Sequence, residues 1–72
     1  MDEFRKRLKK ELETRRITQR YLAQITGLTE VSISRYITGD RVPKANVLLK
    51  ICKALHVSPD YLLGWEDEEK TR

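Results

Sequence analysis

The sequence predicts a small all-α protein, and three observations lead to that prediction. Apolar residues recur at intervals of three and four positions along most of the chain, as they do on one face of a helix. Threonine, serine, glycine and proline stand where such helices would begin and end. The chain has 72 residues, which is enough for one small domain and leaves little room for an enclosed active site.

The first helix is expected from Asp2 to Arg15. Phe4, Leu8 and Leu12 recur every four residues, while lysine and arginine occupy the other faces. Most of these charges are expected to face solvent. A basic helix of this kind can also bind a membrane surface or a groove on a partner protein, but three apolar residues are few for burial in a membrane. We therefore expect no membrane contact.

The segment from Thr18 to Gly39 has the spacing of a helix-turn-helix. Ala23 is small where a second helix has to cross closely, and Gly27 follows four residues later, where a helix end favours a residue that tolerates positive φ. Ile33 follows six residues after Gly27. A small residue, a glycine and a β-branched residue at these intervals predict two short helices joined by a tight turn.

Two threonines are expected to cap these helices. Thr18 and Thr29 each precede a helical segment, where a hydroxyl accepts a hydrogen bond from a free backbone amide. Thr26 is expected to bond its hydroxyl back to a carbonyl one turn earlier. The core contacts of this segment are expected from Leu22, Ala23, Ile25 and Leu28.

The helix that follows Thr29, at about residues 29–37, has two different faces. Ile33 and Tyr36 lie on the face that can be buried, at about 100° per residue. The other face carries a carboxylate, methyl groups, hydroxyls and a guanidinium, which are the groups that read base edges. Its residues span about 140° of the helical wheel and are Glu30, Val31, Ser34, Arg35 and Thr38.

The segment resembles the helix-turn-helix of the Cro and phage-repressor family of bacterial DNA-binding regulators. The similarity continues through KANVLLKICKALHVSPDYLLG, which is similar to the family's fourth and fifth helices, and it covers roughly Phe4 to Gly64. The resemblance implies a compact five-helix, lambda-repressor-like DNA-binding domain over residues 1–64. It also implies that the third helix enters the major groove of DNA, commonly in a dimer.

Four residues of the third helix are predicted to contact bases. Arg35 is long enough for a bidentate contact to guanine O6 and N7, although it can also clamp a phosphate. Val31 can pack against a thymine methyl group. Glu30 can accept from cytosine N4 or simply favour the positive end of the helix, and both interpretations stay open. Ser34 can donate or accept, so it predicts little about sequence.

The resemblance also implies contacts to the DNA backbone from two places. The first is the start of the second helix, with Thr18, Gln19 and Arg20 as candidates. The second is the loop after the third helix and the start of the fourth, with Thr38, Arg41, Lys44 and Asn46 as candidates. A solvated polar side chain is the alternative interpretation for Gln19, Arg41 and Lys44.

The fourth helix is expected from Lys44 to Leu55, with Cys52 in its apolar stripe. Buried packing is favoured for Cys52 over a reactive or metal-binding thiol because the chain has no second cysteine. His56 is expected to end this helix in left-handed geometry. A fifth helix is then expected to begin at a cap, Ser58, followed by proline, and to run to Leu63.

The end of the fifth helix is predicted to contribute a dimer interface. Leu63 and Trp65 flank Gly64, and an exposed tryptophan and leucine suit a protein contact. In the family this end of the domain often forms the dimer contact, while the alternative is that Trp65 covers the edge of the core. Residues 65–72 are expected to be an acidic tail or linker, which a further domain or a protein partner could follow.

Composition narrows the functional classes. A formal net charge of +4 with 36% charged residues favours an anionic partner. One cysteine, no signal peptide and no long apolar run fit a reducing cytoplasm, in a bacterium or for a phage-encoded protein near the nucleoid. The sequence has no paired carboxylates on a shared face, no nucleophile beside a base and no glycine-rich phosphate loop. We therefore expect no enzyme, no metal site and no cofactor.

The sequence therefore predicts a sequence-specific regulator of transcription, expected to be a repressor, that binds double-stranded DNA. It is expected to act as a homodimer on a two-fold related operator, with DNA completing the dimer where self-association is weak. The alternative is a protein-interaction or antitoxin-like module, for which Glu30 and the acidic tail are the best support.

Overall fold

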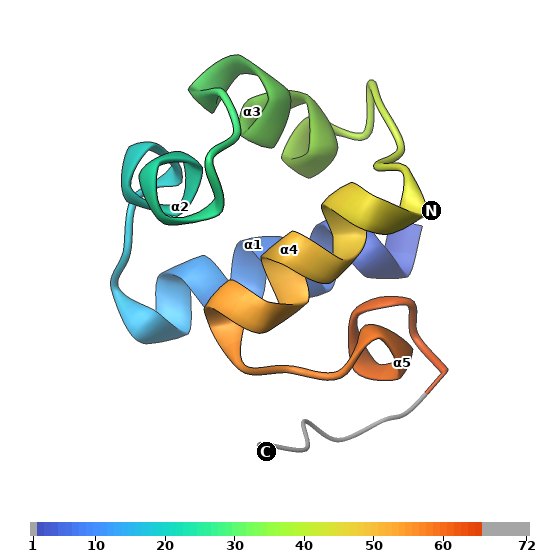
Figure 1. The fold of residues 1–72 in the computed structure, drawn as a ribbon. Helices are drawn as coiled ribbons and strands as arrows, with labels where there is room; N and C mark the ends of the chain where they lie inside the picture. The colour runs from blue at the N-terminus through green and yellow to red at the C-terminus, as the bar shows by residue number, and fades with distance from the viewer. Residues whose placement is uncertain (1, 66–72) are drawn as a thin grey trace.

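The structure is a computed structural model that describes residues 2–65, and these residues form five helices and no strand (Figure 1). The predicted all-α, five-helix class is confirmed, and the helix ends differ from the predicted ones by one residue at most. Lys44 is the N-cap residue just before the fourth helix, and Leu63 is the C-cap residue just after the fifth, whereas both had been predicted to lie within these helices. The predicted tail from residue 66 onward lies outside the described residues. The helices are α1 (Asp2–Arg15), α2 (Gln19–Thr26), α3 (Glu30–Thr38), α4 (Ala45–Leu55) and α5 (Pro59–Leu62).

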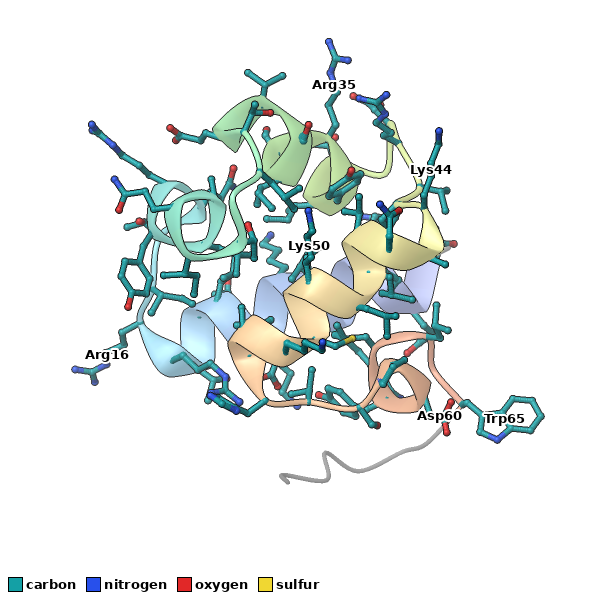
Figure 2. The ribbon with its side chains drawn as sticks, viewed as in Figure 1. Arg16, Arg35, Lys44, Lys50, Asp60 and Trp65 are labelled. Carbon is teal, nitrogen blue, oxygen red and sulfur yellow. The ribbon has the colours of Figure 1, made fainter. Side chains whose placement is uncertain are left out.

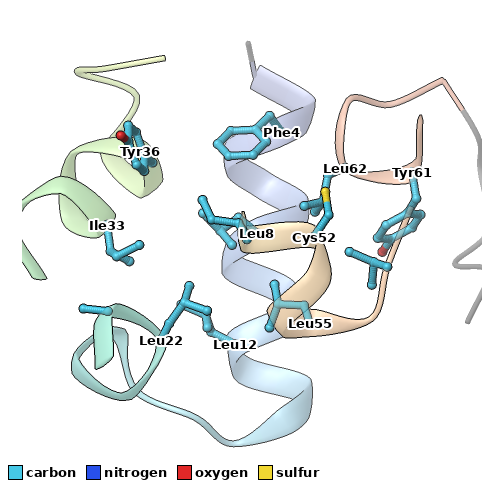
Figure 3. Close-up of a cluster of buried hydrophobic side chains, with 13 residues drawn as sticks. Phe4, Leu8, Leu12, Leu22, Ile33, Tyr36, Cys52, Leu55, Tyr61 and Leu62 are labelled. Carbon is cyan, nitrogen blue, oxygen red and sulfur yellow. The ribbon is translucent and has the colours of Figure 1, made fainter. Parts of the chain in front are cut away.

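One core joins the helices. In Figure 1, α2 and α3 lie on one side of α1 and α4, and α5 lies on the other. Figure 3 shows side chains from all five helices converging between them. Leu8, Leu22, Ile33 and Ile51 are completely buried, and each comes from a different helix. This core fixes the orientation of α3, because the two apolar residues of that helix are part of it.

Helix α2 buries a narrower face than predicted. Leu22, Ala23 and Thr26 are buried, but Ile25 is 44% exposed, so its predicted place in the core was wrong. Ile25 lies about 60° beyond Leu22 on the helical wheel, outside the buried arc. The predicted bond of Thr26 is confirmed, since its hydroxyl donates to the Leu22 carbonyl at 2.7 Å.

An arginine that was expected to be solvated ties α1 to α5. The guanidinium of Arg7 donates to the Tyr61 carbonyl at 2.8 Å and lies 4.7 Å from the centre of the Tyr61 ring. It also pairs with Glu3 at 3.1 Å. A helix of four residues is not stable by itself, so these contacts contribute to holding α5 in place.

Glu11 was also missed as an interior residue. It is only 4% exposed, and its carboxylate pairs with Arg15 one turn later at 2.8 Å. A buried carboxylate needs such a partner because burial of an unpaired charge is costly.

The buried thiol predicts a specific loss of stability at high pH. Burial raises the pKa of Cys52 above its ordinary value, so above about pH 8.5 the unfolded chain releases a thiol proton that the folded chain retains. The free energy of unfolding should then fall, by at most about 1.4 kcal/mol per pH unit from this group. Urea denaturation from pH 7 to pH 10 should show a steeper fall for the natural chain than for Cys52→Ala. Parallel profiles for the two proteins would contradict this assignment.

Candidate nucleic-acid interface

Each helix of the helix-turn-helix begins at a threonine cap, and a glycine ends α2 at the turn between them. The Thr18 hydroxyl accepts from the amide of Tyr21 at 2.9 Å, and the Thr29 hydroxyl accepts from the amide of Ser32 at 3.1 Å. Both predicted caps are therefore confirmed. Gly27 ends α2 with a φ of +74°, in the left-handed region that favours glycine.

The four residues predicted to contact bases lie together on the exposed side of α3. Ile33 and Tyr36 are buried, whereas Val31 is 61% exposed and Arg35 points away from the body of the domain (Figure 2). Glu30, Val31, Ser34 and Arg35 line one shallow hollow, and Gln19 from α2 completes it. The structure therefore brings the predicted base-contacting residues together with one residue predicted to contact phosphate.

The charged groups of this hollow are not engaged in ion pairs within residues 2–65. Glu30 and Arg35 are both exposed and form no ion pair with any residue that the structure describes. In the neighbouring hollow, which Gln19 also lines, the Thr18 hydroxyl accepts a bond as a cap and keeps its proton available for donation. These groups can therefore bind an outside partner without first breaking an internal contact.

The second set of predicted phosphate contacts is only partly assembled. Arg41 and Lys44 line a common hollow beside α3. Asn46 and Thr38 are exposed outside that hollow, and the Thr38 hydroxyl already donates to the Arg35 carbonyl at 3.2 Å. Arg20 is exposed as well, but it lines neither hollow.

Two cations of α1 and the turn after it were missed as neighbours of this surface. Lys9 and Arg16 line a hollow that also contains Thr18 and Gln19, together with the carboxylate of Glu13. Neither cation forms an ion pair within the described part of the chain. Helical periodicity could not have shown this, because Arg16 follows the end of α1 with a positive φ of 56°.

Residues 2–65 contain no cluster of three side chains able to ligate a metal ion. None of the helices in this range is long and apolar enough to cross a membrane. The buried thiol of Cys52, with its raised pKa, is a poor nucleophile at neutral pH.

Comparison with known proteins agrees with this geometry. A family model described as helix-turn-helix matches residues 8–62, which is most of the chain. The chain belongs to this family, of the Cro and phage-repressor type. The resemblance seen in the sequence is thereby confirmed, and the family is one of DNA-binding regulators rather than of enzymes.

Two curated relatives carry the same kind of domain. The chain is 37% identical over 67 residues to the uncharacterized HTH-type transcriptional regulator YqaE of Bacillus subtilis, covering 93% of this chain and 58% of that protein. It is 38% identical over 55 residues to the HTH-type transcriptional regulator DicA of Escherichia coli, covering 75% of this chain and 41% of that protein. The chain therefore spans about half the length of the curated relatives it matches.

A solved structure supports the lambda-repressor-like fold. The P22 c2 repressor, crystallised in complex with a synthetic operator, superposes with a TM-score of 0.78 at 32% identity. The match covers 82% of this chain and 89% of that one.

The left-handed conformation of Gly27 leads to a prediction about the stability of this Cro-type domain. Nothing lies within 4 Å of the position that a Cβ at Gly27 would occupy, so the cost of a side chain there comes from backbone conformation alone. Gly27→Ala should lower the free energy of unfolding by about 1 to 2 kcal/mol, and Gly27→Asn by less, because asparagine tolerates the left-handed region. Denaturant titration of both variants measures this difference. An alanine variant as stable as the asparagine variant would contradict it.

Proposed function

We propose that this domain is a sequence-specific DNA-binding repressor of transcription that reads the major groove with α3. The observation that carries the proposal is the exposed hollow in which Gln19 meets Glu30, Val31, Ser34 and Arg35. Family membership supports it, as does the similarity to a repressor crystallised with an operator. Repression would follow from occupation of promoter DNA in the bacterial cytoplasm.

The side chains divide into two roles in this proposal. The residues of α3 read base edges, with Arg35 on guanine and Val31 on a thymine methyl group. Backbone contacts fix the register of the domain on the duplex but carry no sequence information. The residues proposed for these contacts are Thr18, Gln19, Arg20, Thr38, Arg41, Lys44 and Asn46.

We further propose that two copies bind a two-fold related operator. The described domain measures 28 × 22 × 22 Å. Two domains side by side can therefore place their α3 helices about one helical turn of DNA, roughly 34 Å, apart. Leu63 is 45% exposed and Trp65 is 85% exposed at the end of α5, which supports a dimer contact there.

Selection from a random-sequence duplex library at two salt concentrations tests the proposal. Enrichment of a two-fold related site, with affinity that falls steeply as salt rises, is the expected result. Salt-sensitive binding without any enriched sequence would instead favour the protein-interaction module and refute sequence-specific repression.

The two roles predict different mutant behaviour on the selected site. Arg35→Ala should cost about 1 to 3 kcal/mol of binding free energy and relax the preference at one base position, because it removes a bidentate base contact. Gln19→Ala should weaken binding to all sequences by a similar factor, because it removes a backbone contact. Competition binding with single-base operator variants separates the two patterns. If both substitutions affected every sequence equally, the division of roles would be wrong.

Lys9 and Arg16 line the hollow that contains Thr18, so we expect both cations to strengthen DNA binding by electrostatic attraction. Removing both cations in a Lys9→Gln, Arg16→Gln variant should lower the slope of log affinity against log salt by about 1 to 2, since each phosphate contact contributes roughly 0.9. Glu13→Gln should strengthen binding, because it removes the carboxylate from the same hollow.

A control with the same loss of charge distinguishes contact from net charge. Lys6 and Lys10 are exposed on α1 and line none of these hollows. The Lys6→Gln, Lys10→Gln variant should keep the salt slope of the natural chain. Equal slopes for the two double variants would show that net charge alone matters.

A further inference from the structure

An arginine of α1 lies against the glycine that ends α3. A Cβ placed on Gly39 would lie 3.0 Å from Cδ and 3.3 Å from Nε of Arg5, so the Arg5 side chain passes directly beside this glycine. Gly39 is the C-cap residue of α3, with a φ of +89°. In Figure 1, the start of α1 and the loop after α3 lie at the same end of the molecule. The contact therefore joins α1 to the place where α3 ends.

The loop after α3 is held by one carbonyl. The Arg35 carbonyl accepts from the amide of Gly39 at 3.0 Å, from the amide of Arg41 at 3.3 Å and from the hydroxyl of Thr38 at 3.2 Å. A carbonyl oxygen has two lone pairs, so three donors share them, and two of the three distances are long for a hydrogen bond. These bonds alone hold the loop weakly, and a contact from outside the loop strengthens its position.

The same carbonyl belongs to a residue of the proposed DNA interface. The side chain of Arg35 is proposed to contact guanine, while Thr38 and Arg41 are proposed to contact phosphate. The backbone of Arg35 thus connects the base contact to the contacts with the DNA backbone. A group that supports this loop acts on both kinds of contact.

The packing of Arg5 is explained by the end of α3 rather than by its ion pair. Within residues 2–65, the ion pair of Arg5 is with Asp2, where the distance from Nε to Oδ1 is 3.7 Å and the Asp2 side chain is 82% exposed. Such an exposed pair contributes little to stability. The Arg5 side chain is nevertheless only 38% exposed. A cation is also favoured at this end of a helix, because the last carbonyls carry partial negative charge.

We infer that Arg5 is a positioning residue for DNA recognition. From α1 it supports Gly39, and it thereby keeps Arg41 in the position from which it contacts phosphate while Arg35 contacts a base. Arg5 itself contacts no DNA in this arrangement. The inference rests on the proposed function and adds to it a residue of α1 that acts through the loop.

Hydrogen exchange measured by NMR tests the support of the loop without DNA. Arg5→Ala should speed exchange at the amides of Gly39 and Arg41 by about fivefold or more, because it removes a contact that limits local opening. The amide of Ile51, in the buried part of α4, should exchange as in the natural chain, since Arg5 is not part of the core. Lys6→Ala removes the same charge from an exposed neighbouring residue and should leave all three amides unchanged.

A double-mutant cycle on the selected operator tests the step from the loop to recognition. Arg5→Ala should weaken binding by about fivefold to tenfold in the natural chain, but by less than about twofold in an Arg41→Ala background, where the contact that it positions is already absent. Lys6→Ala should have the same small effect in both backgrounds. The slope of log affinity against log salt should fall by about 1 with Arg5→Ala only while Arg41 is present. A loss of stability alone would not change this slope.

Two results would overturn the inference. Unchanged exchange at Gly39 and Arg41 in Arg5→Ala would show that Arg5 does not support the loop. Equal weakening by Arg5→Ala with and without Arg41 would show that Arg5 acts by its own contact or charge. Failure of the DNA proposal is distinguishable, because it would appear as the absence of an enriched sequence for the natural chain, whereas the exchange measurement uses no DNA.

Discussion

Burial of one shared core holds this domain together, because its helices are too short to be stable by themselves. Isolated helices below about 12 to 15 residues are marginal in water, and α2, α3 and α5 have eight, nine and four residues. Each helix contributes a completely or almost completely buried side chain to the same cluster. Stability is therefore a property of the whole assembly, and no helix can be removed without exposing the apolar face of another.

Because only one face of α3 belongs to this core, its outer face is free to bind a partner. The position of that helix is fixed by Ile33 and Tyr36 on its buried side and by the Thr29 cap and Gly39 at its ends. The exposed residues contribute little to the core, so their identity can follow the partner rather than the fold. A domain of this kind can change the sequence it reads while its framework stays the same.

The features set by local chemistry were predictable from the sequence, and those set by packing between helices were not. The threonine caps, the glycine after α2 and the burial of Cys52 follow from rules that involve a few neighbouring residues. The exposure of Ile25 depends on where α4 crosses α2. The role of Arg7 depends on a carbonyl 54 positions away in the chain. The family resemblance implied a DNA-backbone contact for Gln19, but its position beside Glu30, Val31, Ser34 and Arg35 was found only in the structure.

Helix α1 connects α3, which carries the proposed base contacts, to α5, whose end carries the proposed dimer contact. It contacts α3 on one side and α5 on the other. At the α5 end the fit is close, since a Cβ added to Gly64 would lie 2.8 Å from the Cβ of Glu3. Arg7 adds its bond to the Tyr61 carbonyl at the same place. The orientation of Trp65 therefore depends on a helix that carries none of the proposed base contacts. In the dimer proposed through Leu63 and Trp65, the packing of α1 against α3 and α5 would contribute to the spacing and the angle of the two α3 helices.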